Sequence, residues 1–183
     1  MKALKNEAVG TYEAAALMGV HFTRPKRMAD MGLLACRELE TNGGATFAVY
    51  SSQECDENFE DYVENTEARR RAGEKVGRPR GFLQDRRLVL RVLADPKRPR
   101  IPFEDAIGVV EASKILGVFF TRVIRVVEEG KIVGRIVWSE RGGRSRLWIL
   151  SRASCEAHAA EVRRLEAAGL KKGRPRTAAD RKK

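Results

Sequence analysis

The sequence predicts a mainly α-helical protein with small β wings, built from two tandem copies of one structural unit that are joined by a basic linker containing a helix. Two observations carry this prediction. A motif occurs twice about a hundred residues apart, and glycine and serine residues at matching places divide both copies into the same elements. The chain has 183 residues, which is enough for two small domains.

The repeated motif reads LMGVHFTR in the first copy and ILGVFFTR in the second. A shift of 98 places superposes ten identical residues within 25 positions, from Glu13 to Arg37 of the first copy. Beyond Arg37 the shift becomes 100, which matches Ser51 to Ser151. The second copy therefore has two extra residues, and we expect this insertion to lie in a loop.

Each copy predicts two short helices separated by a tight turn. The first helix covers about residues 11–18 or 109–116 and stops at a glycine. The second helix begins at Thr23 or Thr121, where a hydroxyl group can cap its first turn.

A hairpin and a closing helix complete each copy. The second helix ends at Gly32 or Gly130, because glycine is the usual left-handed C-cap residue. The doubled glycine of ETNGGAT and of SERGGRS predicts a hairpin tip. The closing helix begins near Ser51 or Ser151, and Glu54 gives the first copy a capping-box pattern. Helix, turn, helix, wing and closing helix form a winged helix-turn-helix.

These residues resemble a known group of DNA-binding domains. The segments YEAAALMGV and VEASKILGV, followed by MADMGLL and VEEGKI, are similar to the winged-helix domains of the MerR and excisionase group. The signature of that group runs E-A-A-x-x-L-G-V, then a recognition helix, then a short G-x-L into the wing. The resemblance covers residues 9–66 and 107–168. It implies binding to double-stranded DNA, with the second helix in the major groove and the wing on the backbone.

The second helix of each copy has an apolar stripe and an opposite face suited to DNA. The stripes predicted to be buried are Pro25, Met28 and Ala29 in the first copy and Val123, Val126 and Val127 in the second. Arginine can bond two acceptors of guanine, threonine can bond a base or a phosphate, and isoleucine can touch a thymine methyl group. A solvated helix face is the alternative, but its recurrence in both copies favours DNA contact. The predicted contact residues are Thr23, Arg24, Lys26, Arg27, Thr121, Arg122, Ile124 and Arg125.

The two predicted wings differ in charge. The second wing carries Arg141, Arg144 and Arg146 around its tip, which suits phosphates or a narrow minor groove. The first wing, ETNGGATF, has no cation. We therefore expect the first wing to bind DNA more weakly or to serve another surface.

The tetrapeptide GRPR occurs twice and resembles the AT-hook, whose Gly-Arg-Pro core lies in the minor groove of A·T-rich DNA. A narrow A-tract groove concentrates negative potential, and an extended arginine fits it. The alternative is a basic segment that aids solubility or binds phosphates in general. The arginines expected to contact the groove are Arg78, Arg80, Arg174 and Arg176.

Charge is distributed unevenly along the chain. The formal net charge is +11 with a pI near 10.0, which favours a negatively charged partner. Residues 1–65 have a net charge of −5 and residues 66–183 a net charge of +16. The acidic closing helix of the first copy leaves three alternatives open. The first copy reads DNA weakly, or it docks on the basic half of another protomer, or this helix is simply solvated.

The linker between the copies contains an apolar-periodic segment over residues 83–94. We expect a helix that packs on one of the domains, with a dimer contact as the less favoured alternative. The basic Gly- and Pro-rich segments on either side should be extended or disordered. The predicted organisation is a first domain over 1–67, a linker over 68–105, a second domain over 106–169 and a basic tail over 170–183.

Other classes of function have little support in the sequence. There is no G-x-S-x-G, no P-loop and no convincing acid/base pair, so we expect no enzymatic activity. The three cysteines are far apart and predict neither disulfides nor a metal site, and we expect no cofactor. Trp138 and Trp148 are interpreted as packing residues of the wings, with base stacking as the alternative, and His21 as a turn residue. With no apolar run long enough for a membrane span, we expect a cytoplasmic, nucleoid-associated protein.

The leading functional hypothesis is a sequence-specific transcriptional regulator or repressor. The alternative is an architectural or accessory DNA-binding protein, such as an excisionase-like recombination factor or a nucleoid or segregation protein. A third class is a packaging or scaffold adaptor that uses the acidic first domain for a protein partner. Because the copies are not identical, we expect an asymmetric DNA site.

Overall fold

The chain forms helices and two small sheets. The computed structural model describes residues 6–73, 82–137 and 147–169. Within these residues there are seven α-helices, one short 3₁₀-helix and two three-stranded antiparallel sheets, so the fold is mixed α and β. The prediction of helices combined with small β elements is confirmed. None of the helices described is long and apolar enough to cross a membrane.

The two copies fold into matching halves. The first half comprises β1 (Ala8–Gly10), α1 (Thr11–Met18), α2 (Arg24–Asp30), β2 (Cys36–Glu40), β3 (Thr46–Ser51) and α3 (Ser52–Arg71). The second half comprises η1 (Phe103–Asp105), β4 (Ala106–Ile107), α5 (Val109–Leu116), α6 (Phe120–Glu128), β5 (Gly134–Val137), β6 (Leu147–Ser151) and α7 (Arg152–Ala167). Between them lies α4 (Phe82–Ala94). The predicted first helices, over 11–18 and 109–116, are confirmed.

Glycines end the first two helices of each half as predicted. Gly19 and Gly117 follow α1 and α5 with φ values of 64° and 63°. Gly32 and Gly130 lie two residues beyond α2 and α6 with φ values of 72° and 70°. This left-handed backbone turns the chain sharply toward the hairpin at little steric cost only in glycine.

The predicted threonine caps are wrong in both halves. Thr23 is the N-cap of α2, but its side chain makes no capping bond, and its hydroxyl oxygen lies 3.0 Å from Nδ1 of His21. Helix α6 begins at Phe120 with Phe119 as its N-cap, so Thr121 lies inside the first turn. The imidazole of His21 competes for the Thr23 hydroxyl, and the earlier start of α6 removes the Thr121 hydroxyl from the capping position.

Each closing helix is fixed by a serine at its start. The hydroxyl oxygen of Ser51 accepts a hydrogen bond from the backbone N–H of Glu54 (3.2 Å), and that of Ser151 accepts one from Ser154 (3.1 Å). The Glu54 carboxylate does not complete a capping box and instead accepts from the N–H of Ala35 at 2.6 Å. The start of the closing helix is therefore confirmed, while the role expected for Glu54 is corrected.

Both sheets contain a third strand that the sequence analysis did not predict. The strand orders are β1-β3-β2 and β4-β6-β5. Arg37 lies opposite Val49 in the first hairpin, and Arg135 lies opposite Ile149 in the second. The offset between equivalent residues of the two copies is therefore 98 in the first strand of the hairpin and 100 in the second. The two extra residues lie in the loop between these strands, as expected. The tip of the second hairpin lies outside the described residues.

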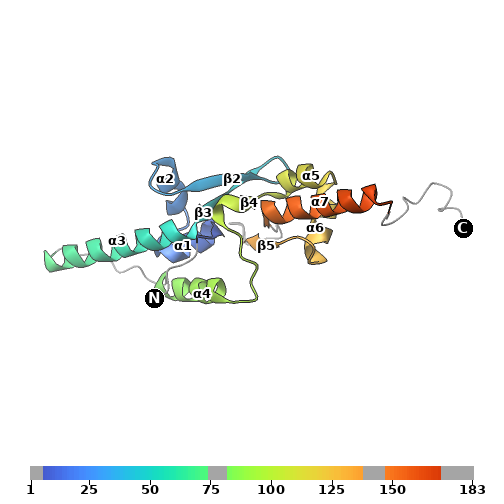
Figure 1. Ribbon diagram of the computed structural model, residues 1–183. Helices are drawn as coiled ribbons and strands as arrows, with labels where there is room; N and C mark the ends of the chain where they lie inside the picture. The colour runs from blue at the N-terminus through green and yellow to red at the C-terminus, as the bar shows by residue number, and fades with distance from the viewer. Residues whose placement is uncertain (1–5, 74–81, 138–146, 170–183) are drawn as a thin grey trace, which may run out of the picture.

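The two sheets pack face to face between outer layers of helices. One cluster of buried residues takes a side chain from each of the six strands, namely Ala8, Leu39, Val49, Ala106, Val137 and Ile149. The next residue along a strand points the opposite way, and Tyr50 and Leu150 accordingly join separate clusters with the helices of their own halves. Figure 1 shows the sheets in the middle of the molecule, with α3 and α7 reaching toward opposite ends. The face of each sheet that meets the other sheet is therefore buried, and helices cover part of the outer face.

Equivalent glycines make reciprocal contacts across this interface. A Cβ atom added to Gly10 would lie 3.1 Å from Cβ of Val137. A Cβ atom added to Gly108 would lie 2.7 Å from the carbonyl oxygen of Glu40 and 3.3 Å from Cβ of Leu39. Gly10 and Gly108 are 98 residues apart, as are Leu39 and Val137. Such exchange of contacts is typical of a twofold arrangement, here within one chain.

We expect Gly108→Ala to destabilise the protein by about 1–3 kcal/mol, because the added methyl group meets backbone that cannot move independently. The free energy of unfolding from a denaturant titration measures the effect. Gly43→Ala is the matched control, since a Cβ atom there would meet nothing within 4 Å. Equal stability of the two variants would contradict the close packing of the two halves.

The linker helix α4 packs on the first half, as predicted. It contacts α1, and Leu93 joins the core cluster of that half. The segment after α4, expected to be extended or disordered, is irregular but buried at important points. Ile101 is completely buried in the cluster between the sheets, and the side chain of Arg98 is 8% exposed. The division of the chain at residues 67 and 105 stays a prediction.

Candidate nucleic-acid interface

The second helix of the first half presents the predicted basic face to solvent. Pro25 is buried, and Met28 and Ala29 are half-buried against the core of this half. The residues predicted to contact DNA are all exposed, namely Thr23, Arg24, Lys26 and Arg27. The division of α2 into a packed side and an exposed basic side is therefore confirmed.

The second half repeats this arrangement on α6. Val123 and Val126 are buried and Val127 is half-buried. Thr121, Arg122 and Arg125 are exposed, whereas Ile124 is half-buried. The predicted packed stripe is confirmed, and of the predicted contact residues Ile124 is the least accessible.

The cations on these faces differ in how far acidic neighbours neutralise them. Nζ of Lys26 lies 3.0 Å from Glu38 and 3.3 Å from Asp30, and these two carboxylates raise the pKa of Lys26 above its ordinary value. Arg122 makes one long ion pair of 4.0 Å with Glu129. No ion pair within the described part of the chain involves the remaining arginines, Arg24, Arg27 and Arg125. These three guanidinium groups are best placed to meet phosphates or base edges.

A cleft brings the two helices into one surface. Its volume is about 830 Å³, and its lining includes Lys26 from α2, Phe120 and Ile124 from α6, and the outer side of the first hairpin. Lys26 and Ile124 are equivalent positions, 98 residues apart. One residue of α2 and two of α6 therefore line a common depression, and none of the residues that line it is an arginine.

Several predicted contact residues lie outside the described residues. They are the second-wing arginines Arg141, Arg144 and Arg146 and the GRPR arginines Arg78, Arg80, Arg174 and Arg176. Trp138 also lies outside, whereas Trp148 is half-buried and packs against the core of the second half, as expected. Roles in DNA binding for these arginines stay predictions.

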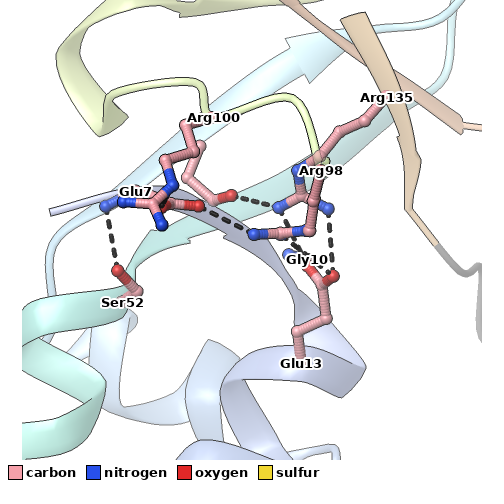
Figure 2. A network of polar contacts seen from close by, with 8 residues as sticks. Glu7, Gly10, Glu13, Ser52, Arg98, Arg100 and Arg135 are labelled. Atoms are coloured by element: carbon pink, nitrogen blue, oxygen red, sulfur yellow. Dashed lines mark hydrogen bonds and ion pairs between the residues drawn. The ribbon is translucent and has the colours of Figure 1, made fainter. Parts of the chain in front are cut away.

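A buried ionic network joins the two halves beside the start of α1 (Figure 2). Arg135, on β5 of the second half, donates to both carboxylate oxygens of Glu13 on α1, at 2.9 and 3.1 Å. It also donates to the backbone carbonyl of Ala8. The same Glu13 carboxylate accepts from the N–H of Gly10 at 2.9 Å. Glu13 thus fixes the start of α1 and holds the other half at the same time.

The linker completes this network with two more arginines. Arg98 lies 2.7 Å from Glu7 and 3.5 Å from Glu13, and Arg100 lies 3.7 Å from Glu7 (Figure 2). Burial and then the charge of Arg135 lower the pKa of Arg98. The carboxylates of Glu13 and Glu7 offset part of this lowering of the Arg98 pKa. The segment predicted to be extended or disordered is therefore tied to the first half by ion pairs.

The equivalent arginine of the first half also crosses the interface. Arg37 donates to the carbonyl oxygens of Phe103 (3.0 Å) and Glu104 (2.6 Å) of the second half. In the sequence, Arg37 and Arg135 stand out only as repeated residues. A signal was present, because the residues two positions before and after each arginine, which share its face of the strand, are apolar. A cation repeated on such a face predicts a buried partner.

The acidic closing helix α3 uses part of its charge inside the first half. Glu54 bonds the chain before β2, and Asp56 accepts from Arg86 of α4 at 2.5 Å. Glu60, Asp61 and Glu64 are exposed farther along the helix. No cluster of potential metal ligands occurs among the described residues. The three alternatives for this helix stay open.

Comparison with known proteins adds no family. No protein-family model, curated protein or solved structure matches the chain.

Proposed function

We propose that this chain is a sequence-specific double-stranded DNA-binding protein that acts without catalysis, built from two tandem winged helix-turn-helix units. In this proposal α2 and α6 are the recognition helices and the two hairpins are the wings. A transcriptional regulator or repressor is the use of DNA binding that we favour.

One observation carries the proposal. Two helices at equivalent positions in the repeat each bury an apolar stripe in their own half and present exposed arginines to solvent. A solvated face needs no such recurrence. Positive charge on two α-helices of suitable size for the major groove matches the negative charge and the acceptor groups of a duplex.

The proposed contacts are of two kinds, those to the DNA backbone and those to the bases. Arg24, Arg27 and Arg125, which form no ion pair in the described structure, supply phosphate contacts and guanine contacts. Thr121 and Arg122 on the first turn of α6 supply base contacts, because the N-terminal part of a recognition helix reaches deepest into the groove. The arginines of the second wing and of the GRPR segments would add minor-groove and backbone contacts.

The two halves should read different sequences. Lys26 is paired with Glu38 and Asp30, whereas the equivalent position of α6 is the apolar Ile124. One chain then contacts two unlike half-sites, and the preferred site is asymmetric.

Selection from a pool of random duplexes tests this function. The wild-type chain should recover two unlike half-sites, and Arg122→Ala/Arg125→Ala should lose one of them, with at least about tenfold weaker binding to the selected duplex. Affinity should fall steeply between about 50 and 200 mM salt, because phosphate contacts release counterions.

The matched control is Arg87→Ala/Arg91→Ala on α4. Both arginines are exposed, and the change removes the same charge from another surface. This control should keep both half-sites. Equal losses in the two double variants, or failure of the wild type to bind any duplex, would refute sequence reading by α6.

An architectural or accessory DNA-binding protein is the second candidate, and the repeated GRPR tetrapeptide is what favours it. Recovery of A·T-rich duplexes alone, with little effect of Arg122→Ala/Arg125→Ala, would support this candidate. A proposed self-association through the acidic first half or through α4 would appear as concentration-dependent mass in sedimentation experiments.

A further inference from the structure

Phe119 is an exposed aromatic residue at the start of α6. Its side chain is 84% exposed, the largest value among the exposed large apolar residues of the described chain. The neighbouring Val118 and Phe120 are each 36% exposed. A phenylalanine ring gains stability by leaving water, so this one is placed where the folded chain alone gives it nothing to pack on.

The position of Phe119 also conflicts with helix capping. Phe119 is the N-cap of α6, with extended backbone (φ −64°, ψ 150°) and no side-chain capping bond. Serine, threonine, aspartate and asparagine stabilise a helix at this position, and phenylalanine cannot. Phe119 is therefore unfavourable both as an exposed aromatic residue and as an N-cap, without a compensating contact. Such a residue indicates a functional role.

The first half resolves the equivalent position differently. Its counterpart is His21, whose ring contacts Phe22 (centroids 4.2 Å apart) and whose Nδ1 lies 3.0 Å from the Thr23 hydroxyl. Phe22 in turn packs on Tyr12, with centroids 5.6 Å apart. The residue equivalent to Tyr12 is Val110, so the second half lacks this aromatic support. His21 is also exposed, but its ring has an aromatic and a hydroxyl neighbour, so within the described residues an exposed apolar ring at this position is particular to α6.

The charges around Phe119 identify the kind of partner. Arg122 and Arg125 are exposed on the next turns of the same helix. The acidic residue Glu129 lies at the opposite end of α6 and is paired with Lys131 and Arg122. An apolar ring bordered by guanidinium groups matches a surface that is anionic at its edges and has small apolar groups between them. The major groove offers this combination at the C5-methyl group of thymine.

We propose that Phe119 contacts a thymine methyl group in the major groove and sets a preference for thymine at one position of the second half-site. This inference rests on the proposed DNA-binding function. It assigns to Phe119 the apolar contact for which the sequence suggested Ile124, which is half-buried. The first half-site, facing His21, has no matching requirement.

The test replaces single thymines of the selected duplex with deoxyuridine, which lacks only the methyl group. At one position in the second half-site the wild-type chain should bind about fourfold more weakly, as expected for the loss of one buried methyl group. Phe119→Ser should weaken binding to the thymine duplex and should respond no further to deoxyuridine at that position. Such non-additivity shows that ring and methyl group interact.

Folding of the variant is checked separately. Serine can cap α6, so the melting temperature of Phe119→Ser should be unchanged or higher by about 2–4 °C. Leu88→Ser is the matched control, because Leu88 is an exposed apolar residue of α4 (57%) far along the chain from α6. This control should keep the wild-type response to every deoxyuridine.

The outcomes separate this inference from the proposed function. If Phe119→Ser binds the selected duplex with wild-type affinity and the wild-type deoxyuridine profile, the inference is overturned while DNA binding stands, and the ring belongs to a protein contact. If the wild-type chain selects no duplex, the proposed function and the inference fall together.

Discussion

Replacing Arg135 with methionine is expected to lower the free energy of unfolding by about 3–5 kcal/mol. The guanidinium group is buried and bonds the Glu13 carboxylate and the Ala8 carbonyl of the other half. Methionine keeps the length of the side chain but leaves Glu13 buried with less of its charge compensated. A denaturant titration followed by circular dichroism measures the change.

Arg37→Met is the control, because it makes the same substitution at the equivalent position. Arg37 is half-buried and donates to two carbonyl oxygens rather than to a carboxylate. Its loss should cost about 1–2 kcal/mol, the scale of ordinary hydrogen bonds. Two variants of equal stability would show that Arg135 adds no stability by compensating the charge of Glu13.

The same pair of variants tests how the halves cooperate on DNA. The Arg135 network fixes α1 of one half against β5 of the other, so it also fixes the separation of the two recognition helices in the proposed function. Arg135→Met should therefore tolerate one or two base pairs inserted between the half-sites better than wild type does. A spacing preference identical to wild type would assign Arg135 to stability alone.

Replacing Arg86 with methionine is expected to cost about 3 kcal/mol and to release α4 from the first half. Arg86 is buried, bonds Asp56 and the carbonyl of Leu17, and lies over the ring of Phe59 at 3.7 Å from its centroid. The Leu17 carbonyl lies in the last turn of α1, where helical partners are missing. Arg86 supplies that partner.

Hydrogen exchange distinguishes local release from global unfolding. In Arg86→Met the amides of α4 should exchange much faster, while those of β3 and β6 stay protected. Arg87→Met, at the adjacent exposed position, should leave α4 protected. Uniformly faster exchange along the whole chain would mean that α4 is an inseparable part of the core.

The helices and their ends were largely predictable because their signals are local. Gly19, Gly32 and their equivalents end helices through their own backbone freedom, and the valines of α6 define its packed side by spacing alone. The threonine caps failed because a cap depends on competing partners. His21 lies beside Thr23, and α6 starts one residue before Thr121.

The contact between the halves was not predicted because it depends on distant residues. Ala8 and Ala106 lie in strands of only three and two residues, too short for a clear period. The apolar runs FAVY and LWIL follow the predicted hairpin tips, and their side chains contribute both to the cluster between the sheets and to the clusters with the helices. Arg98 was assigned to a loose linker on composition, whereas its carboxylate partners are about ninety residues away in the sequence.

For the exposed faces of α2 and α6, the sequence predicted which residues are accessible but not which cations are free. Lys26 and Arg27 are both cations of α2. Only the folded chain shows that Glu38 of β2 neutralises Lys26. Phe119 was overlooked because an apolar residue in a helix-turn-helix motif is expected to be buried. Its exposure is visible only in the folded chain.

The face-to-face packing of the two sheets has a consequence for how the protein responds to dilution. Reciprocal contacts of this kind usually join separate subunits, whose pairing depends on protein concentration. Here Gly10, Gly108 and the side chains around them belong to one covalent chain, so the local concentration of each half around the other is set by the linker. In the proposed function, the occupancy of the DNA site at low protein concentration would therefore rise with the first power of that concentration. The two recognition helices would stay together even at a few molecules per cell.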